Sequence, residues 1–278
     1  MNDWREQLSG QIRNLVVAPV PDQPGLSFLT LYSPALLRRA DITLFVRPGA
    51  QDRTLPLLIL MHGVYGSHWN WWALGNLADI ATRMMQAKEI CDFAIAMPSD
   101  GMRGDGSAYV VHSDLDAESW IMKDVPECIK QVLPNVQTER VFLAGQSMGG
   151  FGALRLGAKY AKQVAGISTH SPVPALADLM PYISDSLAEY ERAGKRDTSL
   201  LYWIRRNRAI LPPIRFDCGM DDALISSNRA LHTVLTREKI PHVYEEHPGG
   251  HDWVYWQEHI DETLRFVSRL ASEPRQAS

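Results

Sequence analysis

The stretch Val141-Phe142-Leu143-Ala144-Gly145-Gln146-Ser147-Met148-Gly149-Gly150 decides the fold of this chain. An apolar run typical of a buried strand ends at Gly145, and the pattern of residues 151–160 is typical of a helix. G-x-S-x-G between a strand and a helix indicates a nucleophile elbow, a sharp turn that projects a serine hydroxyl from the sheet. Gly145 and Gly149 leave room for that turn. The stretch therefore predicts a nucleophilic Ser147. A phosphate-binding loop is excluded because no G-x-x-x-x-G-K-[ST] pattern is present.

Strand-like and helical segments alternate on both sides of this stretch. Leu57-Leu58-Ile59-Leu60-Met61 is continuously apolar, as expected for a strand buried on both faces. The alternation predicts an α/β fold with a mostly parallel central sheet and helices on both faces. We expect further strands at 28–32, 40–47, 93–97, 164–168, 214–218 and 242–246, and helices at 67–88, 117–132 with a kink or restart at Pro126, 225–239 and 254–272. Residues 1–27, with three prolines, predict a loosely packed arm, and residues 273–278 a frayed tail.

One segment interrupts the alternation. Residues 172–213 lie between two expected strands and are long for a plain connection. They hold several aromatic residues and the basic cluster Arg205, Arg206 and Arg208. Two interpretations stay open: a small helical cap over the carboxyl edge of the sheet at about 173–212, or a peripheral insertion with solvated charges. In both cases we expect residues 1–278 to form a single α/β domain.

The composition of the chain indicates which binding partners and which cellular compartment to expect. The 278 residues carry a net charge of −4, so nothing indicates a nucleic-acid or membrane partner. Cys91, Cys128 and Cys218 are far apart, which predicts buried thiols in a reducing compartment rather than disulfides. The N-terminus has no apolar signal-peptide core, and no apolar run is long enough to span a bilayer. We therefore expect a cytoplasmic protein.

A nucleophilic serine needs a base within hydrogen-bond reach. His251 lies in Pro248-Gly249-Gly250-His251-Asp252-Trp253, a glycine loop between the last expected strand and the last helix. His62 also follows a strand but precedes Ser147, which would break the chain order of nucleophile, acid and base. His247 and His251 are four residues apart, yet Pro248 and two glycines prevent a shared helix face, so a metal pair is not expected.

The acid that orients the base should lie between Ser147 and His251. Asp217 falls inside an expected strand, while Asp221 and Asp222 follow its end at Gly219. Either of the last two could instead cap the helix that follows. The spacing of residues does not decide between Asp221 and Asp222.

An oxyanion hole requires two backbone N–H groups. The residue after the nucleophile, Met148, is expected to supply one. The loop His62-Gly63-Val64-Tyr65-Gly66 follows an early strand and is expected to supply the other. Gly63, Tyr65 and Trp253 are candidate substrate-binding residues. Aromatic side chains crowd these two loops and would narrow an acyl pocket, although part of the set is expected in the core: Tyr65, Trp69, Trp71, Trp72, Trp253, Tyr255 and Trp256.

Together these segments resemble the esterase D-like putative esterase branch of the α/β hydrolases. This branch includes S-formylglutathione hydrolases, short-chain carboxylesterases, some feruloyl esterases and mycolyltransferases. The similar pieces span about residues 30–270 and are Ser33–Leu36, Leu60–Gly66, Gly145–Ala153, Cys218–Leu224 and Pro248–Trp253. The resemblance implies Ser147 as nucleophile, His251 as base, Asp222 as acid and the amides of Val64 and Met148 as oxyanion hole.

The resemblance also implies a reaction. We expect a serine carboxylesterase that hydrolyses short-chain esters of small molecules through an acyl-enzyme, with no metal and no cofactor. S-formylglutathione hydrolases carry a Ser where His62 stands and a longer loop after the fourth strand, so a glutathione thioester is disfavoured here. The alternatives are an acyltransferase or thioesterase with the same three residues, and a catalytically inactive binding module on the same fold. A homo-oligomer is compatible with the sequence.

Overall fold

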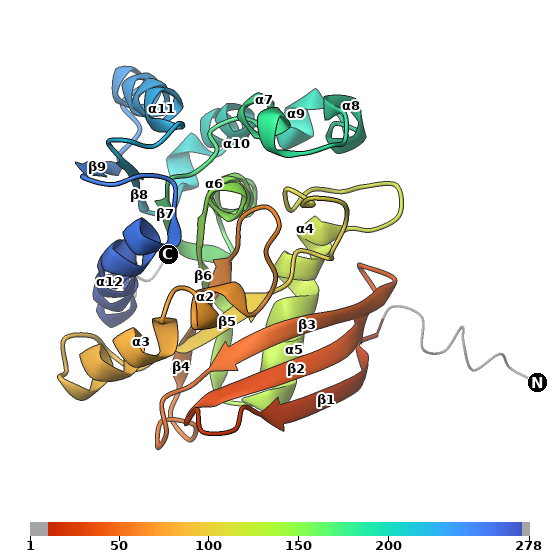
Figure 1. The fold of residues 1–278 in the computed structure, drawn as a ribbon, viewed down its shortest axis with the longest axis vertical. Helices are drawn as coiled ribbons and strands as arrows, with labels where there is room; N and C mark the ends of the chain where they lie inside the picture. The colour runs from red at the N-terminus through yellow and green to blue at the C-terminus, as the bar shows by residue number, and fades with distance from the viewer. Residues whose placement is uncertain (1–10, 274–278) are drawn as a thin grey trace, which may run out of the picture.

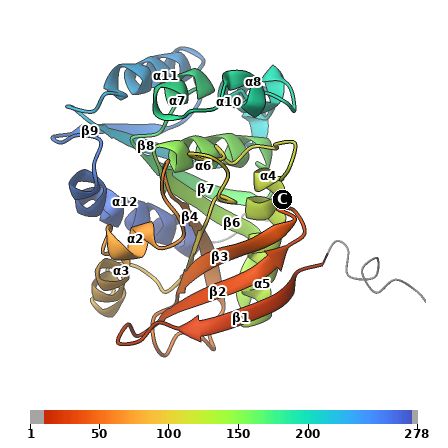
Figure 2. The same ribbon diagram turned by 45° about the vertical axis from the view of Figure 1, so that its right-hand side comes forward.

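A twisted sheet runs through the middle of the molecule, with helices packed on both faces (Figures 1 and 2). The computed structural model describes residues 11–273. Over these residues the strand order is β1-β2-β3-β5-β4-β6-β7-β8-β9. Strands β1, β2, β3 and β5 pair antiparallel in turn, and all pairs from β5 to β9 are parallel. The strands are β1 Arg13–Pro19, β2 Leu26–Ser33, β3 Arg38–Phe45, β4 Leu55–Met61, β5 Ala94–Pro98, β6 Val136–Gln146, β7 Val164–His170, β8 Ile214–Gly219 and β9 Val243–His247. The predicted α/β fold with a mostly parallel sheet is confirmed.

The longer helices pack against the sheet, and most of the short ones lie in the connection between β7 and β8. The helices are α2 Asn70–Ala73, α3 Leu77–Gln86, α4 Ala117–Ser119, the π-helix η1 Trp120–Asp124, α5 Val125–Val132, α6 Met148–Lys159, α7 Leu176–Leu179, the 3₁₀ turn η2 Met180–Tyr182, α8 Leu187–Tyr190, α9 Lys195–Thr198, α10 Leu200–Arg206, the 3₁₀ turn η3 Arg208–Ile210, α11 Ile225–Arg237 and α12 Trp253–Ser272. The predicted restart near Pro126 is confirmed, because η1 passes into α5 at the residue before it. Among residues 11–273, no helix has the length and apolarity that a membrane span needs.

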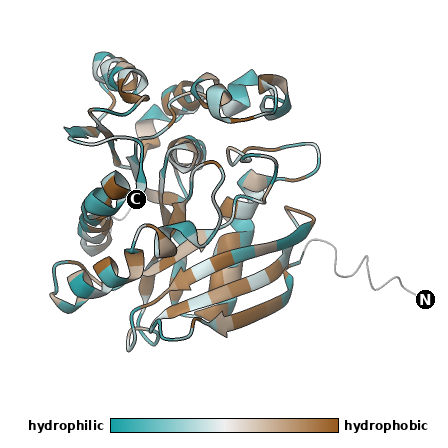
Figure 3. Cartoon of the chain, viewed as in Figure 1, coloured by the Kyte–Doolittle hydropathy of each residue, from teal (hydrophilic) through white to brown (hydrophobic). Residues whose placement is uncertain are grey.

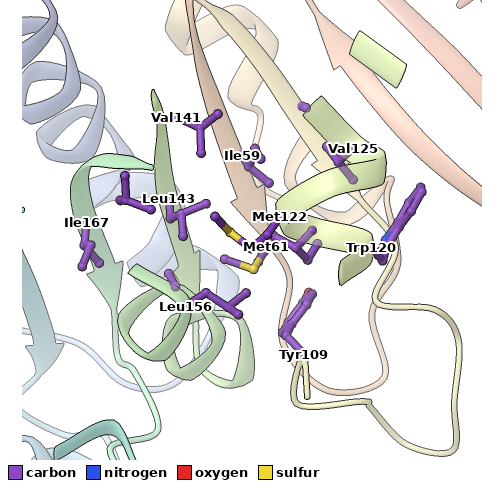
Figure 4. Packing of buried hydrophobic residues seen from close by; sticks show 14 of the residues in the cluster. Ile59, Met61, Tyr109, Trp120, Met122, Val125, Val141, Leu143, Leu156 and Ile167 are labelled. Atoms are coloured by element: carbon purple, nitrogen blue, oxygen red, sulfur yellow. The ribbon is translucent and has the colours of Figure 1, made fainter. Parts of the chain in front are cut away.

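The central strands are apolar because both faces are covered (Figure 3). Along β4, Leu57, Ile59 and Met61 pack into a core with α5 and α6, whereas Leu58 and Leu60 pack into a second core with α3 and α12. Figure 4 shows the first core, where Met61 and Leu143 from neighbouring strands meet side chains of α6 and η1. The predicted burial of 57–61 on both faces is confirmed. Strand β6, which ends at the residue before Ser147, therefore lies between two packed layers.

Two predicted segments differ from the structure. The arm predicted for residues 1–27 falls partly outside the described residues, and within them Arg13–Pro19 forms the edge strand β1. This strand is mostly exposed and lacks an alternating apolar pattern, so periodicity does not predict it. The helix expected at 67–88 is two helices, α2 and α3, because Gly75 and Asn76 separate them and Asn76 adopts a left-handed φ of 49°. Most of the tail at 273–278 lies outside the described residues.

The segment between β7 and β8 (residues 171–213), here called the insertion, folds into the short helices α7 to α10. It lies on the same side of the sheet as α6 (Figure 1). Arg103, in the loop after β5, reaches into it with Nη1 2.7 Å from Asp185 Oδ2. The Tyr190 hydroxyl donates to the Gly106 carbonyl at 2.7 Å. Of the basic cluster, Arg205 pairs at 2.6 Å with Glu238, the residue that follows α11. The insertion is therefore bonded to the 99–113 loop.

Two of the three cysteines are buried as predicted. Cys128 and Cys218 are buried free thiols, and burial raises the pKa of Cys128 to about 12. Cys91 is also a free thiol but is only half-buried, so its predicted burial is wrong. It lies at the end of the turn before β5, where its N–H donates to the Ser268 hydroxyl at 2.8 Å.

Candidate active site

Ser147 occupies the sharp turn between β6 and α6. Its φ of 53° lies in the left-handed region, which is rare for a residue with a side chain. The Ser147 N–H donates to the His170 carbonyl of β7 at 3.1 Å, and its own carbonyl accepts from Phe151 and Val173. These three backbone bonds hold the strained conformation in place. The hydroxyl group thus stands at the carboxyl edge of the sheet, in front of the N-terminus of α6.

The glycines on either side of Ser147 are required by close backbone contact. A Cβ atom on Gly145 would lie 2.6 Å from the Gly149 carbonyl carbon. A Cβ atom on Gly149 would lie 2.5 Å from the Met61 carbonyl oxygen and 2.6 Å from that of His62. Side chains at either position would therefore push α6 away from β4. The G-x-S-x-G pattern reflects this packing.

His251 and Asp222 complete a line of hydrogen bonds from Ser147. Nε2 of His251 lies 2.9 Å from Ser147 Oγ, and Nδ1 lies 2.7 Å from Asp222 Oδ2. The His251 side chain is 27% exposed, while that of Asp222 is fully buried. The imidazole edge packs against the Trp256 ring at a centroid distance of 5.0 Å. One ring therefore connects a buried carboxylate to the Ser147 hydroxyl at the carboxyl edge of the sheet.

The turn after β8 gives Asp221 and Asp222 different surroundings. Asp221 is exposed, and its N–H donates to the Gly249 carbonyl at 2.9 Å. Asp222 is buried, and its Oδ1 accepts the Leu224 N–H at 2.7 Å. Burial raises the pKa of Asp222, but the His251 hydrogen bond and charge, with the Leu224 N–H, outweigh it and hold this pKa below its usual value. Asp222 is therefore a carboxylate at neutral pH.

The two predicted oxyanion residues lie on adjacent elements. Met148 is the first residue of α6, where a backbone N–H has no acceptor four residues earlier. Val64 lies in the loop after β4, which pairs with β6 so that Met61 is opposite Gly145. The Tyr109 hydroxyl fixes the start of this loop, because it bonds the N–H and the carbonyl of His62 at 3.1 and 3.0 Å.

Residues that sequence reasoning did not single out come from the 99–113 loop. Gly106 packs between the two predicted oxyanion residues: a Cβ atom there would lie 2.5 Å from Met148 Sδ and 3.4 Å from Val64 Cγ1. The Ala108 N–H lies 3.3 Å from Met148 Sδ. Asp100 fixes the loop by accepting the Ser107 N–H at 2.6 Å. The glycines and aspartates at 99–113 were the available signal, but they indicated only a loop.

The predicted substrate-binding residues have different surroundings. Tyr65 is 68% exposed, and its hydroxyl donates to the Tyr182 carbonyl of the insertion. Gly63 lies against the Gln146 side chain: a Cβ atom on Gly63 would be 2.8 Å from Gln146 Oε1. Trp253 is half-buried and meets Trp71 edge-on at 5.3 Å. Of the aromatic set, Trp71, Tyr255 and Trp256 are buried in the core, and Trp72 packs against Phe28.

The strand order, with the elbow after a central parallel strand and helices on both faces, defines an α/β-hydrolase fold. A family model described as "Putative esterase" matches residues 34–267, and the chain belongs to this family of esterases. An acetyl esterase of Caldicellulosiruptor saccharolyticus is 29% identical over 241 residues, covering 79% of this chain and 86% of the relative.

Solved structures share the fold. A ferulic acid esterase superposes with a TM-score of 0.77 at 22% identity, covering 94% of this chain and 98% of that chain. An S-formylglutathione hydrolase from Agrobacterium tumefaciens superposes with a TM-score of 0.79 at 17% identity, covering 92% of this chain and 99% of that chain. At these identities the superpositions show the fold alone. The predicted resemblance to the esterase family is confirmed, and the protein is an esterase.

Proposed function

We propose that this esterase hydrolyses short-chain carboxylic esters with Ser147 as nucleophile, His251 as general base and Asp222 as orienting acid. The observation that carries the proposal is the unbroken pair of hydrogen bonds, 2.9 Å from Ser147 Oγ to His251 Nε2 and 2.7 Å from Nδ1 to Asp222. A serine hydroxyl is a weak nucleophile unless such a base takes its proton. The buried carboxylate fixes the imidazole tautomer that leaves Nε2 free to accept that proton.

The reaction then proceeds in two halves. Ser147 Oγ attacks the ester carbonyl while His251 takes its proton, and the resulting oxyanion accepts hydrogen bonds from the amides of Val64 and Met148. The N-terminus of α6 adds its positive dipole end at the same place. His251 returns the proton to the departing alcohol, which leaves an acyl group on Ser147. Water activated by His251 releases the acid and restores the enzyme.

Short acyl groups are favoured by the contacts around the oxyanion residues. The 99–113 loop packs on Met148 and Val64, and Tyr190 of the insertion holds that loop at Gly106. We propose that the insertion, at about 173–212, is a cap over the site, since Tyr65 beside the oxyanion amide bonds Tyr182 within it. The acetyl esterase relative supports a small acyl group.

The test is kcat/KM for p-nitrophenyl esters of increasing acyl length, measured with the purified chain. We expect the highest values for acetyl to butyryl esters and a fall at octanoyl and beyond. Product analysis with added alcohols separates hydrolysis from acyl transfer, and hydrolysis should dominate. A rise in kcat/KM toward long chains would contradict the short-chain proposal and indicate an open, lipase-like groove. The absence of turnover on every ester would instead favour an inactive binding module.

A further inference from the structure

Three metal-ligand side chains meet at the carboxyl end of β9, apart from Ser147 and its partners. His247 is the last residue of β9, and His259 and Glu262 lie one turn apart on α12, which runs beside it (Figure 1). Within residues 11–273, they form the one group of three or more His, Cys, Asp or Glu side chains whose ligand atoms all lie within 4.8 Å of one another. Two imidazoles and one carboxylate thus lie together at this end of the strand.

The distances between these atoms suit a small ion. His247 Nε2 lies 3.4 Å from Glu262 Oε2, and His259 Nδ1 lies 3.5 Å from Glu262 Oε1. The two imidazole rings are stacked with centroids 4.2 Å apart. Zinc binds nitrogen and oxygen at about 2.0–2.1 Å, so neighbouring ligands of a tetrahedral ion are about 3.4 Å apart. Because the ring planes are only 16° from parallel, one imidazole must turn about its χ2 angle before both nitrogens can bind the same ion.

One of the three candidate ligand atoms makes no hydrogen bond. Nε2 of His247 is buried and, although Glu262 Oε2 lies 3.4 Å away, it forms no hydrogen bond within residues 11–273. A buried polar atom without a partner destabilises the fold, and a bound cation would offset that cost. The His247 and Glu262 side chains are still 24% and 29% exposed, so an ion can enter from solvent.

The charge around the cluster favours a cation. Arg215 is the guanidinium that the carboxylates share: it pairs with Glu262, with Asp217 at 2.7 Å and with Glu245 at 2.8 Å. Three carboxylates thus share one guanidinium, and Asp217 also lies 2.8 Å from His170 Nδ1. Arg215 approaches Oε2 of Glu262, which leaves Oε1 on the side of His259.

We propose that His247, His259 and Glu262 form a binding site for Zn²⁺ or a similar divalent transition-metal ion, with water in the remaining position. Two imidazoles with a carboxylate are a ligand set that suits zinc and is poor for Mg²⁺, which prefers oxygen ligands. The ion would be structural. The His247 carbonyl accepts the Met220 N–H at 2.8 Å, and the Gly249 carbonyl accepts the Asp221 N–H at 2.9 Å. Holding His247 therefore steadies the segment that leads to His251 and the turn beside it.

The experiment adds Zn²⁺ alone to the chelator-treated full chain and measures calorimetric stoichiometry and the thermal midpoint. We expect one ion per chain and a rise in midpoint, since an ion that binds only the folded state stabilises it. His259→Gln should weaken binding at least tenfold and remove the rise. Glu262→Gln is a second variant and should also lose binding. Glu262 pairs with Arg215 as well, so if Glu262→Gln fails to fold, the result of His259→Gln alone decides. Mg²⁺ should have no effect.

Two control variants separate this site from other imidazoles. His232→Gln alters the half-buried pair in which His232 Nδ1 lies 2.9 Å from His242 Nε2, and His251→Gln removes the proposed base. Both should bind Zn²⁺ as the unchanged chain does. Binding that is lost in either control and kept in His259→Gln would overturn the proposal, as would a Kd weaker than about 1 mM in the unchanged chain. Because binding and midpoint are measured without substrate, the outcome is independent of the proposed ester hydrolysis.

Discussion

Asp222→Asn is a nearly isosteric change that should nonetheless remove most of the activity. Oδ1 of Asp222 accepts the Leu224 N–H at 2.7 Å, and Oδ2 faces His251 Nδ1 at 2.7 Å. In the variant the amide oxygen must stay toward the Leu224 N–H, because the amide NH₂ cannot accept a hydrogen bond. The NH₂ then faces Nδ1, which has to become the acceptor. The ring proton moves to Nε2, which faces Ser147 and can no longer take its proton.

The expected loss follows from this change of tautomer. Replacing the orienting carboxylate of a serine triad by its amide lowers kcat by about 10³–10⁴. This corresponds to about 4–5.5 kcal/mol of activation free energy. The assay is kcat on p-nitrophenyl acetate at neutral pH, with circular dichroism to show that the fold is retained.

The matched control is Asp221→Asn, one residue away and exposed. Its activity should stay within a few-fold of the unchanged enzyme, because its side chain does not face His251. A kcat for Asp222→Asn within tenfold of the unchanged enzyme would refute the tautomer argument. A larger loss in Asp221→Asn than in Asp222→Asn would mean that the acid has been assigned one residue too late.

Two further changes test the scaffold around the site. Gly149→Ala should lower the thermal midpoint by several degrees, because the new Cβ would lie 2.5 Å from the Met61 carbonyl oxygen and overpacking costs about 1–3 kcal/mol. Gly250→Ala is the control, because the nearest atom to its new Cβ would be 3.7 Å away. Equal midpoints for the two variants would contradict the packing argument. Burial raises the pKa of Asp217, but His170, Arg215 and Tyr255 outweigh it and hold this pKa well below its usual value. A lowered carboxyl pKa stabilises the fold above about pH 4, and this stabilisation is lost as the pH falls toward the folded-state pKa. Asp217→Asn should therefore lower the free energy of unfolding at pH 7 and make it fall less steeply with pH in acid. An unchanged fall in acid would contradict this role of Asp217.

The sequence predicts those parts of the site that depend on local backbone geometry. The elbow at Ser147 needs glycines two residues away on each side, and such a local requirement is visible without a structure. His251 is predictable for a similar reason, since a glycine loop places it between a strand and a helix. The turn after β8 is harder, because only the burial of Asp222 and the exposure of Asp221 separate two adjacent aspartates.

Other features depend on contacts between distant segments. Gly106 packs on Met148, and Tyr109 bonds His62, although nothing near residues 99–113 in the sequence indicates these partners. The same holds for His247: its neighbour in sequence, His251, faces Ser147, while its neighbours in space are on α12. The edge strand β1 is missed because an exposed strand has no apolar face to give it a period.

The most direct test of the proposed mechanism is covalent labelling of the nucleophile. A fluorophosphonate should add one label per chain, and peptide mass spectrometry should place it on Ser147. Ser147→Ala should take no label and lose ester hydrolysis, while Ser226→Ala, an exposed serine on α11, should behave as the unchanged enzyme. A label on another serine, or undiminished hydrolysis by Ser147→Ala, would contradict the assignment of Ser147 as the nucleophile.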